Sequence, residues 1–228
     1  SRAELAKLAA NAPGARVFCR IFMDGAGSDW PLSRKFGCEP DLAIELLCQA
    51  AEDGLVPAGV SFHVGSQQRN LGQWDVAIER AAFVFSALGA RGVELELMNM
   101  GGGFPARYLQ DIEPVENYGE IIRASIVKHF GNRPPRIIAE PGRSIAGDAG
   151  IIQSEVVLVA EKSREVGPVV LAGPTCDEVD VLYKKTEYQL PLALDSGDKI
   201  ELLSTGAYTS TYASIGFNGF PPLNEYYI

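Results

Sequence analysis

The sequence predicts an α/β domain over residues 1–148 and a mainly antiparallel β domain over residues 149–228. In the first part, short apolar runs typical of strands alternate with longer runs that have the period of an amphipathic helix. In the second part the helical period nearly disappears, and β-rich runs follow one another. The strand-like runs of the first part start about 40 residues apart, a spacing typical of βα units with parallel strands.

Each element of the first part has its own signal. Ser1-Arg2-Ala3-Glu4 resembles a capping box and begins a helix that we expect to end near Asn11. We expect strands at residues 16–22, 60–64, 94–100 and 136–140, and helices over residues 41–53, 72–88 and 115–130. An open doubly wound sheet and a (βα)8 barrel both use this alternation. Four strands make half of such a barrel, so a barrel needs residues that this sequence lacks.

The elements of the second part are shorter. Residues 151–160 and 169–172 are β-rich, and a third run at 198–204 follows the turn signal Asp195-Ser196-Gly197. Because short strands joined by turns usually pair antiparallel, we expect a mainly antiparallel sheet here.

Composition and charge exclude several classes of protein. The chain has 228 residues, of which 46% are hydrophobic, so it can bury a substantial core and is not a disordered chain. No apolar run approaches the length of about 20 residues that crosses a bilayer, and we expect no membrane contact. With 20 basic against 29 acidic residues, the net charge of −9 opposes nucleic-acid binding. The negative field mildly favours cationic ligands, although solubility is the simpler interpretation of the charge.

The four cysteines match no metal or disulfide framework. They are Cys19, Cys38, Cys48 and Cys176, and none forms a CxxC pair. Without a secretion signal, we expect reduced thiols and a cytoplasmic location. We therefore expect no metal site, and we expect three of the four to be small core residues.

Unusual residues stand at the carboxyl ends of three successive predicted strands. These residues are His63, the run Gly101-Gly102-Gly103, and Glu140. In a parallel α/β architecture that edge of the sheet gathers binding and catalytic groups. A strand-end histidine by itself is more often a structural, hydrogen-bonded residue. The chain's other histidine, His129, follows Lys128 on a predicted helix and is expected at the surface.

The glycine run and the segment Glu140-Pro141-Gly142-Arg143 both suit an anion. Three glycines let the backbone approach a ligand closely and point its N–H groups at it. The guanidinium of Arg143 has a fork of donors that suits phosphate. A tight turn and a plain salt bridge are equally good interpretations of the two motifs taken singly. The glycine run is neither a Walker loop nor a dinucleotide fingerprint.

Three loops of the second part carry further candidates. Gly173-Pro174-Thr175-Cys176-Asp177 sets a thiol beside a carboxylate in a turn, which is a poor place for a core cysteine. Tyr208 and Phe217 place aromatic rings on two later loops, where they could close over a ligand or simply pack.

Taken together and in this order, these motifs resemble the fold-type III pyridoxal-phosphate-dependent decarboxylases of basic amino acids, nearest to the ornithine and lysine/ornithine branch. The resemblance covers nearly the whole chain. It implies a partial (βα)8 TIM-like barrel followed by a β domain, as in the alanine racemase and ornithine decarboxylase fold. It implies a lyase that uses pyridoxal 5′-phosphate to convert L-ornithine, and also L-lysine, into a diamine such as putrescine and CO2 in polyamine biosynthesis. It also implies a homodimer with shared active sites.

The resemblance assigns a role to each candidate. His63, Glu140 and Cys176 would be the catalytic residues: His63 stacks on the cofactor ring, Glu140 pairs with the pyridine nitrogen, and Cys176 supplies a proton. Asp177 would bind the substrate's distal ammonium, with Phe217 lining the pocket. The residues that would hold the cofactor's phosphate side are Ser66, Gly101, Gly102, Gly103, Gly142, Arg143 and Tyr208.

The sequence departs from the family pattern in two places. No position matches the motif that carries the family's cofactor lysine, and the chain passes from Arg164 to Pro168 where the family has some tens of residues. We therefore expect the sequence to be part of a longer protein. The alternatives are a non-catalytic binding or regulatory homologue, an inactive fragment, or a diaminopimelate or arginine decarboxylase. The acid after Cys176 is Asp, whereas the diaminopimelate enzymes usually have Glu there.

Overall fold

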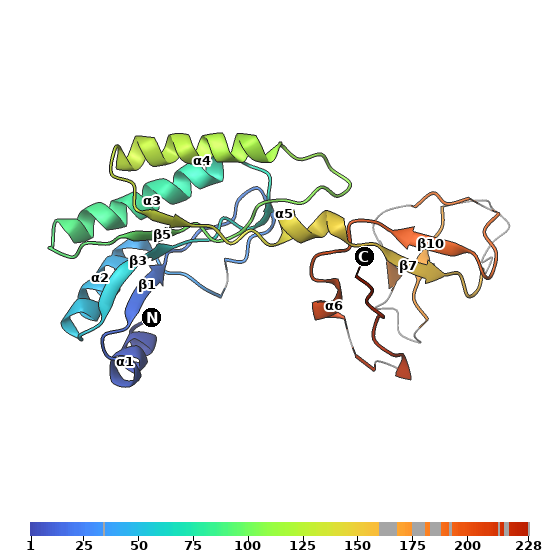
Figure 1. Cartoon of the computed structure of the whole chain (residues 1–228), viewed down its shortest axis with the longest axis horizontal. Helices are drawn as coiled ribbons and strands as arrows, with labels where there is room; N and C mark the ends of the chain where they lie inside the picture. Colours follow the sequence, from blue (N-terminus) through green and yellow to red (C-terminus); the bar gives the residue numbers. More distant parts are fainter. Residues whose placement is uncertain are drawn as a thin grey trace. The chain divides into compact units, whose positions relative to one another are not determined.

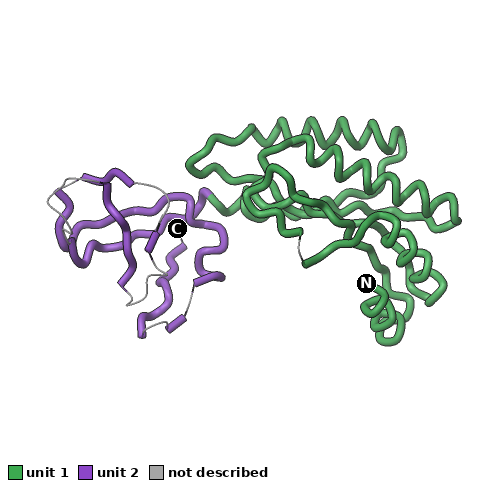
Figure 2. Tube along the Cα trace, turned by 180° about the vertical axis from the view of Figure 1, so that it is seen from behind, with its two compact units in different colours: residues 1–147 green, residues 148–228 purple. Residues whose placement is uncertain are grey.

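The computed structural model describes residues 1–33, 35–159, 168–174, 181–182, 188–191, 193–213, 215–216 and 219–227. The chain divides into two compact units, residues 1–147 and 148–228 (Figures 1 and 2). Three of the predicted site residues, Cys176, Asp177 and Phe217, lie outside the described residues, as does most of the segment between Arg164 and Pro168.

The first unit is built on a four-stranded parallel sheet with the order β1-β3-β5-β6. Its strands are β1 (Arg16–Arg20), β3 (Val56–Ser61), β5 (Leu97–Asn99) and β6 (Arg136–Ile138). The helices between them are α2 (Pro40–Glu52), α3 (Gly72–Gly89) and α4 (Val115–Phe130). The strand order follows the chain without reversal, and α2 packs on α3 and α3 on α4 along one side (Figure 1). This is the arrangement of barrel strands rather than of a doubly wound sheet, which has a point where the order reverses.

The core lies between the sheet and this layer of helices. On α3, Trp74, Ile78 and Leu88 are fully buried, and the buried positions recur at the helical period. The Trp74 ring lies 5.2 Å from the ring of Phe104 and 5.3 Å from that of Tyr118, centroid to centroid. Burying side chains of this size against Phe62 and Met98 of the sheet side stabilises the unit by about 2 kcal/mol each.

The first helix, α1 (Arg2–Asn11), begins as the capping box predicts. The backbone N–H of Glu4 donates to Ser1 Oγ at 3.3 Å, which satisfies one of the unpaired donors of the first turn. Leu5 is buried in a second, smaller cluster with Leu46 and Leu55, and so the helix packs against α2.

A further pair of short strands was missed by the sequence analysis. Strand β2 (Ser28–Trp30) pairs antiparallel with β4 (Ser66–Gln68), which follows the end of β3. Neither strand has the apolar alternation that would predict it, and buried polar contacts hold the two strands in place. The pair matters for the site, since it carries Trp30 and Ser66.

The second unit contains two antiparallel pairs among its described residues. Strand β7 (Ile152–Glu155) pairs with β10 (Lys199–Leu202), and β8 (Leu171–Ala172) pairs with β9 (Val181–Leu182). A short helix, α6 (Thr209–Tyr212), follows them. In the sequence, α5 (Arg143–Ala146) belongs to the end of the first unit, and the 3-10 turn η1 (Gly147–Ala149) spans the boundary between the two units. The antiparallel pairing agrees with the predicted fold class. Within the described part of the chain, each helix is too short or too polar to pass through a membrane.

One expectation about the first unit is wrong. His129 is not a free surface residue: its side chain is 12% exposed, and its Nε2 lies 3.0 Å from Asp75 Oδ1. Asp75, on α3, also accepts hydrogen bonds from Ser125 at 2.8 Å and from Lys128 at 2.9 Å. This cluster ties α3 to α4. The hydrogen bonds from Lys128 and Ser125, with a further one from His129, lower the pKa of the Asp75 carboxyl to about 2.

We predict that Asp75→Asn destabilises the protein at neutral pH by about 1 kcal/mol, after allowance for solvent screening. The pKa of Asp75 is lower in the folded protein than its ordinary value of 3.8, so the stabilisation is complete above that value and is lost as the pH falls toward 2. Urea unfolding at several pH values measures the effect. The gap between wild type and variant should close between about pH 4 and pH 2. A control, Asp111→Asn, removes a carboxylate whose side chain is 92% exposed, and it should change stability little at any pH. A gap for Asp75→Asn that does not depend on pH would contradict the prediction.

Candidate functional site

Three of the predicted site positions lie in one row across the edge of the sheet. The register pairs Ser61 of β3 with Asn99 of β5, and Asn99 with Ile138 of β6. His63, Gly101 and Glu140 each come two residues after these positions. Backbone hydrogen bonds continue the pairing past the strand ends, since the N–H of Glu140 donates to the carbonyl of Gly101 at 2.8 Å. The parallel register therefore places the imidazole, the glycine run and the carboxylate at one level.

The carboxylate of Glu140 is held by Asn99, which the sequence analysis missed. The Asn99 side chain is buried, and its Nδ2 donates to Glu140 Oε1 at 2.7 Å. Its Oδ1 accepts from the backbone N–H of Gly101 at 2.9 Å. One amide thus fixes both the carboxylate and the start of the glycine run. The signal available in the sequence was a polar residue, Asn99, directly after the apolar Leu97 and Met98 of a predicted strand.

A second missed residue, Arg20, lies beside this row, at the level of Ser61. It ends β1 and pairs in register with Ser61. Burial lowers the pKa of Arg20, while the charge of Glu140 opposes that shift. The same two charges act on His63, whose pKa is lowered first by burial and then by Arg20, with Glu140 acting in the opposite direction. Arg20, His63 and Glu140 therefore interact electrostatically, and the imidazole is neutral at physiological pH.

The hydrogen bonding of His63 defines its tautomer. The backbone N–H of Gly65 donates to His63 Nδ1 at 3.1 Å, so the ring proton is assigned to Nε2. A neutral imidazole with a fixed ring plane is suited to stacking on a flat ligand.

Close approaches of the backbone explain the three glycines. Gly101 has φ +62° and Gly103 has φ +105°, in the left-handed region that favours glycine. A Cβ at Gly101 would lie 2.3 Å from the carbonyl oxygen of Phe62, and one at Gly102 would lie 2.9 Å from that of Glu140. The run is thus a tight turn packed between its neighbours, and a ligand is not needed to explain its composition. The turn also leaves backbone in place of side chains beside His63 and Glu140.

Arg143, at the start of α5, is surrounded by groups that orient its guanidinium. Its Nε donates to Ser66 Oγ at 3.3 Å and its Nη1 donates to Tyr108 Oη at 3.0 Å. The guanidinium carbon lies 5.0 Å from the ring centroid of Trp30 and 5.9 Å from that of Tyr108, which are cation–π distances. Trp30 and Ser66 face each other in the β2–β4 pair. Sequence reasoning predicted Ser66 and Arg143 but missed both aromatic residues, because only the pairing of β2 with β4 brings Trp30 near.

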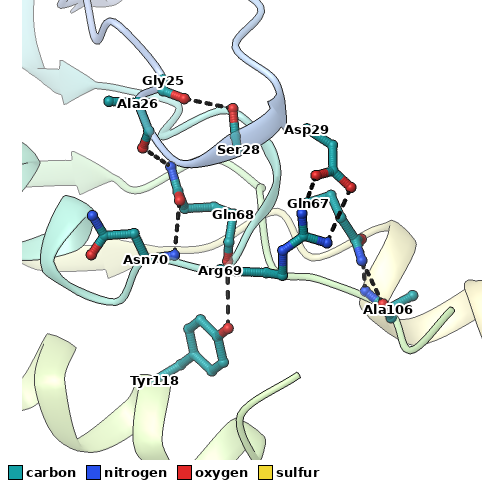
Figure 3. A network of polar contacts seen from close by, with 10 residues as sticks. All are labelled: Gly25, Ala26, Ser28, Asp29, Gln67, Gln68, Arg69, Asn70, Ala106 and Tyr118. Atoms are coloured by element: carbon teal, nitrogen blue, oxygen red, sulfur yellow. Dashed lines mark hydrogen bonds and ion pairs between the residues drawn. The ribbon is translucent and has the colours of Figure 1, made fainter. Parts of the chain in front are cut away.

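Two buried glutamines hold this strand pair in place (Figure 3). Gln68 Nε2 donates to the carbonyl of Ala26 at 3.0 Å and to the carbonyl of Val64 at 2.8 Å. Gln67 exchanges two hydrogen bonds with the backbone of Ala106, at 2.6 and 3.0 Å. Both glutamines are fully buried, so each unmade bond would cost about 1–3 kcal/mol.

The ends of the strand pair are tied to their surroundings as well. The ion pair between Arg69 and Asp29 fastens β2 to the segment after β4, and Tyr118 Oη on α4 donates to the carbonyl of Gln68 at 3.4 Å (Figure 3). These contacts therefore hold the strand pair that contains Ser66 and Trp30 in one position.

Gly142 and Tyr208, two further predicted cofactor-binding residues, make backbone and ring contacts of their own. Gly142 precedes α5 and accepts backbone hydrogen bonds from Ile145 and Ala146, both at 3.1 Å, so it has a structural reason for its position. Tyr208 belongs to the second unit, where it precedes α6 with φ +66°. Its ring meets the ring of Tyr212 edge to face, with the centroids 5.8 Å apart. The roles predicted for Cys176, Asp177 and Phe217 remain sequence predictions.

Comparisons with known proteins identify the family. Residues 1–147 match the sequence model of the pyridoxal binding domain of the pyridoxal-dependent decarboxylases, and residues 142–206 match that of their C-terminal sheet domain. The chain belongs to this family. The predicted family, fold class and pyridoxal-phosphate cofactor are thereby confirmed.

Two curated relatives illustrate the likeness. The chain is 27% identical to ornithine decarboxylase of Caenorhabditis elegans and 28% identical to lysine/ornithine decarboxylase of Selenomonas ruminantium. Each alignment covers 95% of this chain and 62% of the relative, so the chain spans less than two thirds of their length. The first alignment runs over 266 positions, more than the 228 residues here, so that relative has residues without a counterpart in this sequence.

Solved structures agree with these relatives. The arginine decarboxylase of Paramecium bursaria Chlorella virus superposes with a TM-score of 0.86 at 29% identity, over 100% of this chain and 70% of that one. A lysine/ornithine decarboxylase of Vibrio vulnificus, complexed with putrescine, has a TM-score of 0.83 at 29% identity, over 96% of this chain and 65% of that one. The fold of the whole chain is therefore that of this family.

We predict that Gly103→Ala destabilises the protein by about 3 kcal/mol, because its Cβ would meet backbone atoms at a left-handed φ. That Cβ would lie 2.5 Å from the carbonyl oxygen of Gly65 and 2.8 Å from Val64 Cγ2. The matched control is Gly119→Ala on α4, where an added Cβ meets nothing within 4 Å. The control should be neutral or stabilised by up to about 1 kcal/mol. Urea unfolding measures the free energy of unfolding of each variant. Equal values for the two variants would show that the turn is not constrained as described.

Proposed function

We propose that this chain is part of a pyridoxal-phosphate-dependent carboxy-lyase that removes CO2 from a small basic L-amino acid. L-Ornithine is the first proposed substrate and L-lysine the second, each giving a diamine. The observation that carries the proposal is the row formed by His63, the glycine run and Glu140, with Arg143 beside it. Membership of the decarboxylase family supports it.

The residues present fit the cofactor chemically. A phosphate needs fixed cationic and hydroxyl donors, and Arg143 with Ser66 and Tyr108 forms such a set. A pyridine nitrogen needs a carboxylate, and Glu140 supplies one whose orientation is fixed by Asn99. The flat ring needs a neighbour without charge, and the lowered pKa of His63 keeps its imidazole neutral.

Bound pyridoxal phosphate supplies an electron sink for the charge that CO2 leaves behind. In the proposal, Glu140 accepts a hydrogen bond from the pyridine nitrogen and holds a proton there. Asn99 and Arg20 act on Glu140, since the first donates a hydrogen bond to it and the second places a positive charge near it. His63 stacks on the ring, and Arg143, Ser66, Gly142, the glycine run and Tyr208 hold the phosphate.

The sequence predictions for the second unit complete the proposal. Cys176 donates a proton from Sγ to the substrate carbon that has lost CO2, and Asp177 binds the distal ammonium, with Phe217 in the pocket. A carboxylate facing the distal end selects a cationic side chain. The family resemblance further suggests that two copies of the chain share each active site.

The alternatives are a diaminopimelate decarboxylase, an arginine decarboxylase and a non-catalytic homologue. Diaminopimelate decarboxylase of Staphylococcus aureus is 31% identical over 68% of this chain, but the Asp after Cys176 favours a basic substrate. Because the chain superposes on a viral arginine decarboxylase, arginine is a further candidate substrate. A non-catalytic homologue has no need to retain Glu140, Arg143, Cys176 and Asp177 together, and all four are present.

The experiment that tests the proposal measures cofactor attachment and CO2 release on the purified full-length protein, because no position of this sequence matches the motif of the cofactor lysine. Pyridoxal phosphate should become fixed to a lysine after borohydride reduction, as intact mass shows, and ornithine or lysine should yield CO2 and the diamine. Glu140→Gln should bind the cofactor yet lose at least about 100-fold in kcat. The control Glu120→Gln changes an exposed carboxylate on α4 and should be fully active. Attachment without turnover of any basic amino acid would favour a binding homologue, and turnover of arginine or diaminopimelate alone would reassign the substrate.

We also predict that Trp30→Ala weakens the binding of pyridoxal phosphate about fivefold, the size of one exposed cation–π contact. Binding of pyridoxal, which lacks the phosphate, should be unchanged, because Trp30 acts through Arg143. Fluorescence titration with the two ligands separates the effects. The control Phe83→Ala removes a ring of equal exposure, 53%, from α3 and should alter neither affinity. An equal loss for both ligands would mean that Trp30 only supports the fold.

A further inference from the structure

Two cysteines that are 19 positions apart in the sequence lie side by side in the first unit. Cys19 Sγ and Cys38 Sγ are 3.6 Å apart, and both side chains are partly buried. Cys19 belongs to β1, while Cys38 forms an isolated parallel bridge with Ile21 just beyond that strand. The backbone N–H of Cys38 donates to the carbonyl of Arg20 at 3.0 Å, and Phe22 N–H donates to the carbonyl of Cys38 at 2.7 Å. The proximity of the two sulfurs therefore follows from backbone pairing.

We propose that Cys19 and Cys38 form a reversible dithiol–disulfide pair, a modification site separate from the proposed decarboxylase chemistry. A disulfide requires the sulfurs to approach to about 2.05 Å, so they must move together by roughly 1.5 Å. Residues on diagonal positions of paired strands are spaced near the upper limit for a disulfide, so the bond forms with some shift of the segment around Cys38. A strained disulfide is more easily reduced than a relaxed one, which makes this pair a reversible site rather than a permanent cross-link.

The two thiols also differ in reactivity. The hydrogen bond from Cys19 lowers the pKa of Cys38 to about 7, while the pKa of Cys19 is raised by the same contact and by burial. Cys38 is thus the thiol with a substantial thiolate fraction at neutral pH, and thiolate is the attacking form. Cys19 is the second thiol, held in contact with the first.

The oxidant in the proposal is a low-molecular-weight disulfide. Cys38 thiolate bonds to one sulfur of the reagent, whose S–S bond breaks and releases a thiolate. Cys19 then loses its proton to solvent and attacks Cys38 Sγ, which forms the protein disulfide and releases the second small thiol. Two protein thiols are oxidised, and one small disulfide is reduced to two thiols.

The bond would close the segment between β1 and α2 at its base. This segment contains β2, with Asp29 and Trp30, and it starts directly after Arg20. Oxidation would therefore fix both ends of the segment that carries Trp30 to Arg143. The existence of the disulfide does not depend on the proposed decarboxylase function.

The test equilibrates the purified native protein in buffers with graded ratios of reduced to oxidised glutathione. Free thiols are then blocked by alkylation, and peptides are mapped by mass spectrometry. We expect a peptide pair joined through Cys19 and Cys38, with the loss of two hydrogens, whose fraction rises and falls reversibly with the ratio. Glutathione attached to Cys38 without the internal disulfide, or no oxidation of either cysteine across the whole range, would overturn the proposal.

Three comparisons make the result specific. Cys48→Ser removes the third described cysteine, on α2, and should leave the Cys19–Cys38 disulfide unchanged. Cys19→Ser should stop the reaction at glutathione bound to Cys38. Wild-type protein unfolded in urea should pair its cysteines by their separation in the sequence, with Cys38–Cys48 ahead of Cys19–Cys38. An equal yield of the Cys19–Cys38 peptide in native and unfolded protein would contradict the role of the fold. The wild-type map decides the question even if the Cys19 variant fails to fold.

Discussion

The parallel register between Ser61, Asn99 and Ile138 is the constraint on which the candidate site depends. It sets the ends of β3, β5 and β6 at one level, so the residues two positions further on meet in a row. A slip of one residue in any strand would turn its site side chain to the opposite face of the sheet. The buried face of the sheet resists such a slip, because it would expose apolar side chains now packed under Trp74 and its neighbours on α3. The packing of the core fixes the strand register, and the register fixes the geometry of the site.

The other side of the site depends on buried polar groups rather than on apolar packing. Gln67 and Gln68 are fully buried, and their amides pair with the backbone of Ala26, Val64 and Ala106. These bonds fix the β2–β4 pair, which has little apolar surface of its own. Through this pair Ser66 and Trp30 reach the guanidinium of Arg143. A buried network of this kind holds only one arrangement, since any other leaves an amide without partners.

Electrostatics separates a charged part of the site from a neutral one. Arg20 and Glu140 attract each other, and Asn99 adds a hydrogen bond to the carboxylate. His63 lies within reach of both charges, but burial and Arg20 together lower its pKa and keep the ring neutral. A carboxylate, a neutral ring and an oriented guanidinium are thus available at one edge for three different parts of one ligand.

The alternation of strands and helices, the cap on the first helix and the order of the motifs follow from the sequence alone, since periodicity, caps and glycine turns are local signals. It also located His63, Glu140 and Arg143, because they follow apolar strands that the sequence shows directly. The residues that support them are seen only once the chain is folded. Asn99, Arg20 and Trp30 have no local signature, and the partners of His129 and Cys38 lie on other elements. Contacts of this kind depend on strand register and on how far-apart segments pair, and a single sequence carries no local pattern for either.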